Sequence, residues 1–420
     1  MTGIEYEEFL DLDYDPRKSD LVARFRIEPA ADMSVEAAAS RVASESSNGT
    51  WAALHVDESE FTDLRALTFE VDEHGESATV AIAYPKALFE DGSMPQILSC
   101  IAGNIMGMKA VDSIRLLDCD WPEAIVETFP GPAYGSSVAR EKLDAGDRPI
   151  LATVPKPKVG LSTNAHVDIG RHAWRGGLDL LKDDENLTDQ NFNRFEERVT
   201  RAFEVRDEIE AETGDRKDYL VNITADTEEM IRRAEYVAEQ GGGFVMVDII
   251  TAGWAGLQTV RERTGDLDLA IHAHRAMHAA FDRLDHHGVS MRCLAQFSRL
   301  CGVDHIHTGT ADLGKLENED TAGINAWLKG DLYGLNDVLP VASGGLHPGL
   351  VPTLIDELGT DIAVQVGGGV HGHPDGTEAG ARAFRAAIEA AADGVPLENA
   401  AEETPALAVA IDKWGHETPR

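Results

Sequence analysis

From about residue 150 onward, short apolar runs alternate along the chain with longer segments of mixed apolar and charged residues. The longer segments have helical periodicity or an Ala-, Glu- and Arg-rich composition, as at 189–213 and 228–240. Eight apolar runs are spaced fairly regularly, at 150–154, 177–181, 219–223, 244–249, 269–272, 305–307, 341–343 and 362–366. Strands buried on both faces and alternating with helices predict a parallel sheet. Eight such units in roughly 250 residues predict a (β/α)8 TIM barrel.

The first 130 residues have a different pattern, which predicts a smaller α+β domain. Residues 21–27 alternate as a strand, and Ser34 is the expected N-cap of a helix that continues through Val42. Further expected elements are strands at 51–55, 67–71 and 78–84, a helix at 94–106 and a Pro- and Gly-rich linker at 130–135. We therefore predict an α/β chain with an N-terminal domain at 1–130 and a barrel domain at 131–420.

The composition is that of a globular protein, with 43% hydrophobic and 26% charged residues. No apolar run approaches the roughly 20 residues that a membrane span needs, and the acidic N-terminus is unlike a signal peptide. The cysteines form no CxxC pair, which favours free thiols in a reducing compartment: Cys100, Cys119, Cys293 and Cys301. We expect a cytoplasmic protein that does not bind membranes.

The formal charge is −37 and is spread along the chain, which argues against a basic face for nucleic acid or anionic membranes. Only eleven of the 37 basic residues are lysines. An acidic, lysine-poor surface is suited to molar salt, in which charges are screened within roughly 3 Å. We therefore expect a halophilic source.

Active sites of barrels lie at the C-terminal ends of the strands, and the second expected strand ends in Lys182, Asp183, Asp184 and Glu185. Taken alone, this sequence is more often an exposed charged turn than a site. Because side chains alternate along a strand, Lys182 and Asp184 should point the same way, and Glu185 can join them from the loop. Two carboxylates suit Mg²⁺, provided that Lys182 is neutral or is converted into an oxygen ligand by carbamylation.

The other strand ends carry residues of the same kind. Glycine-rich ends on the last two strands are the usual phosphate site of a barrel. A cationic or hydroxyl cluster of Arg275, His307 and Ser343 could hold a second phosphate. The strand-end residues are Lys156 and Lys158, His272 to Arg275, His305 to His307, Lys315 after a glycine, Ser343 to Gly345, and Gly367 to Gly369. Two phosphate sites that flank a metal predict a small bisphosphate sugar as substrate.

The two His-x-His pairs, His272/His274 and His305/His307, also permit zinc ligation, as in a barrel hydrolase with a carbamylated lysine between two metals. Such hydrolases carry His-x-His on the first strand, where this chain has lysines. The acids after Lys182 also favour Mg²⁺ over zinc. We expect one histidine of each pair to be structural and hydrogen-bonded within the barrel.

These motifs stand in the order of a known family. They are KPKVGLS, GGLDLLKDDEN, HAHRAMHA, DHIHTGT, SGGLHPG and GGGVHGHP, with ESSNGTW and GNIMGMK in the N-terminal region. The chain resembles the large subunit of ribulose-1,5-bisphosphate carboxylase/oxygenase (RuBisCO) nearly end to end, and most resembles its archaeal form III branch.

The resemblance implies that Lys182 is carbamylated by a non-substrate CO₂ and, as N6-carboxylysine with Asp184 and Glu185, binds Mg²⁺. It implies that this carbamate takes the C3 proton of the sugar, while Lys156 handles protons at C2, with Lys158 nearby. His274 would assist hydration and proton movement. Lys315, on a mobile loop, would close over the site and orient CO₂.

The resemblance also assigns the phosphate contacts and an assembly. Arg275 and His307 match one phosphate site, with Ser343 beside the substrate. The other phosphate site matches Thr50, Trp51, Gly345, Gly367 and Gly368. Glu45 and Asn104 match residues that reach the site from a partner subunit. We therefore expect a homodimer with shared active sites, with higher assembly open and no small subunit.

The implied activity is carboxylation of ribulose 1,5-bisphosphate to two 3-phosphoglycerates, with O₂ as competing substrate and a role in AMP and nucleotide-ribose salvage. The alternatives are a RuBisCO-like enolase or isomerase without carboxylation, or a non-catalytic protein on the same fold. Two departures from the family concern loop closure: Asn318 replaces a more usual glycine, and the chain ends soon after Trp414.

Overall fold

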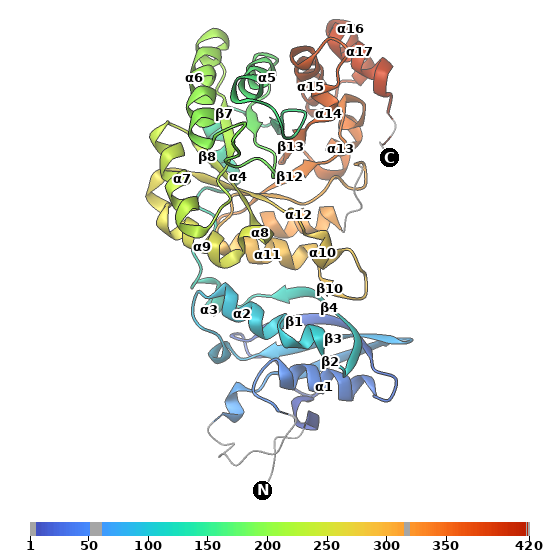
Figure 1. Cartoon of the computed structure of the whole chain (residues 1–420). Helices are drawn as coiled ribbons and strands as arrows, with labels where there is room; N and C mark the ends of the chain where they lie inside the picture. Colours follow the sequence, from blue (N-terminus) through green and yellow to red (C-terminus); the bar gives the residue numbers. More distant parts are fainter. Residues whose placement is uncertain (1–5, 51–60, 315–319, 417, 419–420) are drawn as a thin grey trace. The chain divides into compact units, whose positions relative to one another are not determined.

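A computed structural model describes residues 6–50, 61–314, 320–416 and 418, except the side chains of Tyr6, Glu7, Val138 and Ala139 (Figure 1). The chain forms two compact units. The first comprises Met1–Pro130, Met277–Cys301 and Leu332–Gly334, and the second comprises Gly131–Ala276, Gly302–Asp331 and Leu335–Arg420. The division into domains at 1–130 and 131–420 stays a prediction.

The second unit is built on a closed barrel of eight parallel strands, so the predicted α/β barrel is confirmed. The strands follow one another around the barrel in the order β11-β12-β13-β5-β6-β7-β8-β9. Each overlaps one of the eight apolar runs, because its side chains are covered on both faces. Their bounds are β5 Ile150–Thr153, β6 Leu180–Lys182, β7 Asp218–Asn222, β8 Phe244–Asp248, β9 Ala270–His274, β11 His305–His307, β12 Leu339–Ser343 and β13 Ala363–Val366.

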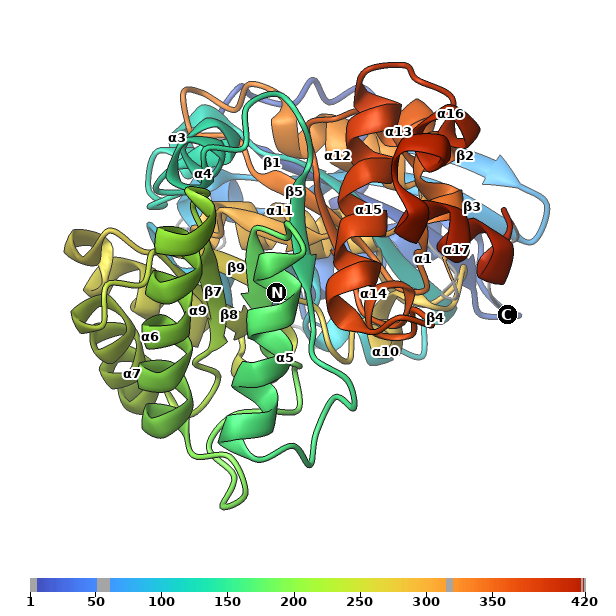
Figure 2. The same cartoon turned by 90° about the horizontal axis from the view of Figure 1, so that it is seen from above.

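Helices connect these strands, and α5 and α7 are among those with a side-chain cap at the N-terminus. The hydroxyl of Ser162 accepts a hydrogen bond from the backbone N–H of Ala165, and Asp226 does the same for Glu229. Figure 2 shows α5 between α6 and α15, which it contacts on either side. The helices are α4 Gly135–Leu143, α5 Thr163–Arg175, α6 Phe195–Thr213, α7 Thr227–Glu239, α8 Ile249–Ala252, α9 Trp254–Arg263, α12 Thr321–Lys329, α13 Val351–Leu358, α14 Gly368–His371, α15 Thr377–Ala392, α16 Leu397–Glu403 and α17 Pro405–Trp414. Single 3-10 turns lie at η6 Gly265–Leu267 and η7 Pro348–Leu350.

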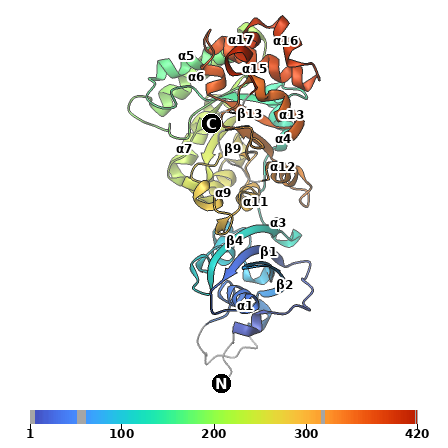
Figure 3. The same ribbon diagram turned by 90° about the vertical axis from the view of Figure 1, so that its right-hand side faces the viewer.

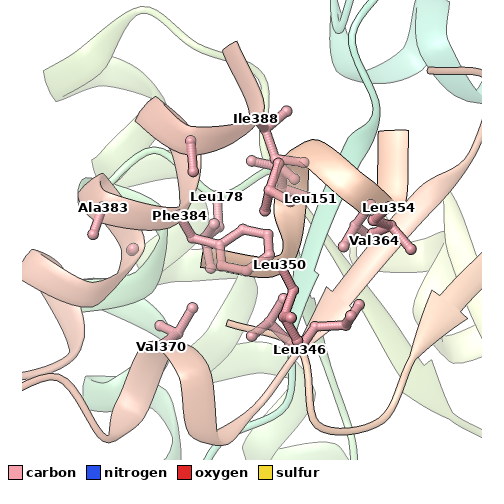
Figure 4. Packing of buried hydrophobic residues seen from close by; sticks show 14 of the residues in the cluster. Leu151, Leu178, Leu346, Leu350, Leu354, Val364, Val370, Ala383, Phe384 and Ile388 are labelled. Carbon is pink, nitrogen blue, oxygen red and sulfur yellow. The ribbon is translucent and has the colours of Figure 1, made fainter. Parts of the chain in front are cut away.

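An apolar cluster joins α15 to the barrel wall (Figure 4). Phe384 and Ile388 of α15 belong to it, together with Leu151 of β5 and Val364 of β13. Full burial of one such side chain stabilises the fold by about 1.5–3 kcal/mol. The cluster therefore fixes the strands whose C-terminal ends carry the candidate residues.

The first unit is a five-stranded sheet in the order β10-β4-β1-β3-β2. Helix α1 packs on this sheet (Figure 3) and is capped by Ser34 as predicted. The elements are η1 Tyr6–Phe9, β1 Leu21–Pro29, α1 Val35–Glu45, η3 Thr62–Leu64, β2 Leu67–His74, β3 Ser77–Tyr84, η4 Lys86–Leu88, α2 Met94–Ile101, η5 Asn104–Gly107, β4 Val111–Asp120, α3 Glu123–Val126, α10 Ala279–Asp282, β10 Gly288–Val289 and α11 Met291–Cys301.

Two expectations for the first unit need correction. The helix expected at 94–106 ends at Ile101, and the chain continues as the separate 3-10 turn η5 after Gly103. The strand β4 was not predicted at all. The strand expected at 51–55 lies outside the described residues. No helix in the described part of the chain has both the length and the apolar character needed to cross a bilayer.

Candidate active site

Lys182 is the last residue of β6 and is fully buried at the C-terminal end of the barrel strands. Its ammonium group donates a hydrogen bond to the backbone carbonyl of Asp183 at 2.8 Å. Burial lowers its pKa from 10.5 to about 8, against the opposite effect of Glu185 and Asp184. A substantial fraction of the side chain is therefore a neutral amine near pH 8.

Asp183 points away from Lys182 and belongs to a buried ionic network. Its carboxylate accepts hydrogen bonds from Arg198, from the hydroxyl of Tyr219 and from the backbone N–H of Asn222. His166 lies 3.4 Å from the same carboxylate. The three acids that follow the strand therefore have two functions. Asp183 anchors the loop, and Asp184 and Glu185 are left for the site.

Asp184 and Glu185 face two lysines from the end of β5. The Nζ of Lys156 lies 3.6 Å from Oδ2 of Asp184, and the Nζ of Lys158 lies 3.7 Å from Oε1 of Glu185. Burial raises the pKa of Asp184, but hydrogen bonds from Asn186 and the positive charges of Lys156 and Lys182 outweigh it and lower the pKa overall. Asp184 is therefore an anion with cations around it, which is the state of a metal ligand.

The residues present fit a hard divalent cation only if Lys182 supplies an oxygen. Within the described ranges, no three His, Cys, Asp or Glu side chains are placed to hold a metal ion. Asp184 and Glu185 supply two carboxylates, and the buried amine of Lys182 is the third group beside them. As a carbamate it would complete an oxygen donor set of the kind that Mg²⁺ prefers.

His274, the last residue of β9, faces the same site. Its Nε2 lies 3.7 Å from Oε2 of Glu185, and its Nδ1 lies 2.9 Å from Oδ1 of Asp248. Burial and the charge of Lys182 lower the pKa of its imidazole. Asp248 was missed from the sequence, although an acid after the apolar run Phe-Val-Met-Val was a usable signal.

The His-x-His pairs make contact directly rather than around a metal. The Nε2 atoms of His272 and His307 are 2.8 Å apart, and the Nδ1 of His307 lies 2.7 Å from the hydroxyl of Ser343. The Nδ1 of His272 is buried with no hydrogen-bond partner among the described residues. A buried N–H without a partner is costly, so we place the shared proton on Nε2 of His272. His307 then donates from Nδ1 to Ser343, which leaves the hydroxyl proton of Ser343 for a ligand.

His305 is structural through packing rather than through hydrogen bonds, which corrects the expectation above. Both of its ring nitrogens are buried without a hydrogen-bond partner in the described part of the chain. Its ring packs against Phe244 at 5.7 Å between centroids and edge-on to His272 at 5.8 Å. Burial lowers its pKa to about 4, so the ring is neutral.

The glycine-rich strand ends lie beside the first strand. After β12, Gly344 and Gly345 have φ of +110° and +91°, a conformation that favours glycine. Gly367 follows β13, and a Cβ at this residue would lie 2.8 Å from Cε of Lys156. Arg275, directly after β9, is 8% exposed. The structure therefore brings Lys156, Lys158, Lys182, Asp184, Glu185, His274, Arg275, His307, Ser343, Gly345, Gly367 and Gly368 to one end of one barrel.

The remaining predicted residues lie in the first unit or outside the described residues. Glu45 ends α1 and Asn104 begins η5, two elements that contact each other within the first unit, and Thr50 follows α1. Trp51 and Lys315 lie outside the described residues, as does Asn318.

Comparison with known proteins gives one family over nearly the whole chain. Residues 135–414 match the ribulose bisphosphate carboxylase large chain, catalytic domain, and residues 8–125 match the N-terminal domain of the same chain. The chain is 51% identical to the ribulose bisphosphate carboxylase of Pyrococcus furiosus, covering 99% of both chains. It is 46% identical to that of Archaeoglobus fulgidus, covering 99% of this chain and 98% of the relative.

Solved structures agree. The octameric RuBisCO of Pyrococcus horikoshii OT3 superimposes with a TM-score of 0.94 at 49% identity, covering 98% of this chain and 97% of that one. The dimeric archaeal RuBisCO of Hyperthermus butylicus superimposes with a TM-score of 0.93 at 46% identity, covering 98% and 99%. This chain belongs to the ribulose bisphosphate carboxylase large chain family.

Proposed function

We propose that this protein carboxylates ribulose 1,5-bisphosphate with CO₂ to give two molecules of 3-phosphoglycerate. The observation that carries the proposal is the buried amine of Lys182 at a strand end, with Asp184 and Glu185 beside it. Full-length relatives from several archaea that are named for this activity support it.

Activation begins at Lys182. Its neutral amine attacks CO₂, a C–N bond forms, and the nitrogen loses one proton, so that the amine becomes an anionic carbamate. Asp184, Glu185 and this carbamate would hold Mg²⁺. When bound, the ion supplies Lewis-acid polarisation of the sugar oxygens and stabilises the developing enediolate.

The side chains of this barrel then bind the substrate and move its protons. The carbamate on Lys182 takes the C3 proton, and Lys156 holds and returns a proton at C2. The Nζ of Lys156 lies 3.6 Å from Oδ2 of Asp184, beside the residues that would hold the metal. His274 assists hydration and proton movement, with Nε2 turned toward Glu185. Lys158 lies beside Glu185 and adds positive charge for the substrate.

The substrate phosphates bind at opposite sides of this centre. One is bound by the backbone of Gly345, Gly367 and Gly368 with Thr50 and Trp51, where bare backbone allows close approach. The other is bound by Arg275, while His307, whose ring nitrogens contact His272 and Ser343, orients the hydroxyl of Ser343 to donate to the substrate. Lys315 orients CO₂.

The assembly and the physiological setting belong to the same proposal. Glu45 and Asn104 complete the site from a second copy of the chain, so the active unit is a homodimer; relatives of known structure include a dimer and an octamer. We place the enzyme in the archaeal form III branch, in the cytoplasm of a halophile and in AMP salvage, with O₂ as competing substrate and no small subunit.

The test is fixation of ¹⁴CO₂ into acid-stable product with ribulose bisphosphate, in molar KCl after preincubation with Mg²⁺ and bicarbonate. Wild type should form labelled phosphoglycerate, and Lys182→Ala should form none. Lys217→Ala is the matched control. Lys217 is also buried with a lowered pKa, but it lies just before β7, at the N-terminal end of the barrel strands. It should retain activity.

If wild type binds the bisphosphate but fixes no CO₂, carboxylation is wrong. Exchange of the C3 proton with solvent would then identify an enolase or isomerase that uses the same residues. Absence of both reactions would leave a binding protein on this fold.

A further inference from the structure

Asp248 is a buried acid at the candidate site that none of the assigned roles uses. It ends β8 and pairs in register with His274, the last residue of the neighbouring strand β9. Its relative exposure is 4%. Residues in register on adjacent strands project to the same face, so both side chains are directed toward the barrel end that carries Lys182.

The carboxylate of Asp248 makes two contacts, one with the last residue of β9 and one with the segment that follows it. Its Oδ1 lies 2.9 Å from Nδ1 of His274 and accepts a hydrogen bond from the backbone N–H of Ala276 at 3.0 Å. Its own backbone N–H donates to the hydroxyl of Thr224 at 2.9 Å, which ties the acid to the loop after β7. Asp248 is thus fixed through its backbone by Thr224, and its carboxylate in turn contacts His274.

This geometry decides which nitrogen of His274 is left for the substrate. The backbone N–H of Ala276 also lies 3.2 Å from Nδ1 of His274, but its shorter bond, at 3.0 Å, is to Oδ1 of Asp248. An ionised carboxylate accepts hydrogen bonds and donates none, so the hydrogen between Asp248 and His274 belongs to Nδ1 of the ring. The other nitrogen, Nε2, is the one that faces Glu185, at 3.7 Å. Rotation of the ring by 180° about Cβ–Cγ would break the bond to Asp248 and leave the carbon Cε1, in place of Nε2, facing Glu185.

We propose that Asp248 is a positioning residue that fixes the ring orientation and Nδ1–H tautomer of His274 and presents its Nε2 to the substrate. Through the N–H of Ala276, the same carboxylate also fixes the backbone on the far side of Arg275. The inference rests on the proposed function for its consequence in catalysis, but not for the ring placement itself. Acids behind a histidine have this role in other enzymes, in which loss of the partner costs activity although the histidine stays.

The two contacts predict that Asp248→Asn keeps a higher kcat than Asp248→Ala. Both donors reach the same oxygen, Oδ1, and an asparagine amide can accept both bonds through its own oxygen. Asp248→Asn should therefore keep the ring in place and lose less than about tenfold in kcat. Asp248→Ala removes both acceptors and should lower kcat by about 10- to 100-fold, the usual cost of losing such a partner.

The experiment compares Asp248→Asn, Asp248→Ala, His274→Ala and the double variant Asp248→Ala/His274→Ala in the full-length protein. Kinetics with ribulose bisphosphate give kcat and KM separately, and crystal structures give the ring orientation of His274. If Asp248 acts on kcat through His274, adding Asp248→Ala to His274→Ala should lower kcat almost no further, and the loss of the bond to Ala276 beside Arg275 should appear in KM. Asp218→Asn, at the opposite end of β7, is the control for loss of a buried carboxylate and should leave kcat unchanged.

Additive losses in the double variant would overturn the proposal, because Asp248 would then act independently of the ring. So would an unchanged ring orientation and kcat in Asp248→Ala. A wild type that fixes no CO₂ would defeat the proposed function alone, since the ring orientation in the variant structures would still decide whether Asp248 positions His274.

Discussion

At the scale of single residues, Gly367 leaves the room that the side chain of Lys156 occupies. A Cβ on Gly367 would lie 2.8 Å from Cε of the lysine, which is shorter than real Cβ contacts. The atom in the way belongs to the end of a flexible side chain, so the lysine would move while the backbone stays. Glycine at this position therefore determines where the amine of Lys156 can lie.

Gly367→Ala should lower activity without lowering stability. Displacement of a reacting group by about 1 Å can cost about 100-fold in rate, and we expect a loss of kcat/KM on that order. The midpoint of thermal unfolding should stay within error of wild type. Gly265→Ala is the control, because a Cβ there meets no atom within 4 Å. A large fall in unfolding midpoint with Gly367→Ala would show that the backbone, and not the lysine, gives way.

Strand alternation explains which residues of the site could be found from the sequence. It predicts that Lys182 and Asp184 share a face, and the structure has Asp183 on the other side, bonded to Arg198 and Tyr219. Alternation could not predict that Asp183 has an anchoring function, since its partners come from α6 and β7. Asp248 was missed for the same reason. Its contact is with His274 on the neighbouring strand, 26 residues away in the sequence.

At the scale of elements, the barrel strands were predictable and β4 was not. The barrel strands are apolar throughout because both faces are covered, which leaves a clear signal. In β4, by contrast, the polar residues Ser113 and Arg115 are buried. Arg115 is satisfied by the backbone carbonyl of Asp282, far away in the sequence. A strand that buries polar side chains among its apolar ones has no alternating pattern to recognise.

A chain of hydrogen bonds joins the ends of β5 and β13. The hydroxyl of Thr153 donates its only proton to the carbonyl of Val366 at 2.6 Å, so it must accept from Nε2–H of His371 at 2.8 Å. The Nδ1 of His371 then accepts from the hydroxyl of Thr377 at 3.1 Å. The strands that carry Lys156 and Gly367 are thereby linked to the start of α15.

His371→Leu should loosen this junction and raise the KM for ribulose bisphosphate by about tenfold. That change corresponds to the loss of about 1.4 kcal/mol, within the range for hydrogen bonds. His373→Leu is a matched control, since its Nε2 contacts the carbonyl of Ala406 instead. It should change stability and leave KM unaltered. Equal KM values in His371→Leu and wild type would contradict a role of these linked hydrogen bonds in phosphate binding.

At the scale of the whole molecule, buried titratable groups determine how stability changes with pH. Burial lowers the pKa of His166, His305 and His371 to about 4, from 6.5. Between these values the unfolded state binds more protons, so stability rises with pH. Burial raises the pKa of Asp218 from 3.8 to about 6, which acts in the opposite direction over the same window. Three groups against one give a net rise.

The free energy of unfolding should therefore increase from pH 4 to 6.5 by several kcal/mol, since one pKa unit corresponds to about 1.4 kcal/mol. Urea unfolding at fixed salt measures it. His305→Phe should flatten the rise, because the histidine has no hydrogen-bond partner in the described residues and titrates only on unfolding. His74→Gln, at an exposed residue, should not. A stability that falls across this window would contradict the assignment.

The charge of −37 governs the response of the whole molecule to salt. Surface ion pairs such as Arg175–Glu212 and Arg232–Glu229 are present, and salt weakens such pairs. There are, however, 74 acids to 37 basic residues, so repulsion among unpaired carboxylates outweighs the pairs. In most proteins the two effects nearly cancel. Here screening should stabilise the fold.

We expect the protein to be stable in molar KCl and to lose structure, or to dissociate, on dilution to about 10 mM salt, where charges interact over about 30 Å. Circular dichroism follows the structure and sedimentation velocity follows the assembly. Choline chloride at equal ionic strength should protect as well as KCl, because the effect is screening; Mg²⁺ is omitted so that binding at Asp184 and Glu185 does not contribute. If only KCl protected, bound potassium would be the cause. Full structure and activity in dilute buffer would contradict adaptation to salt and leave the acidic surface without this explanation.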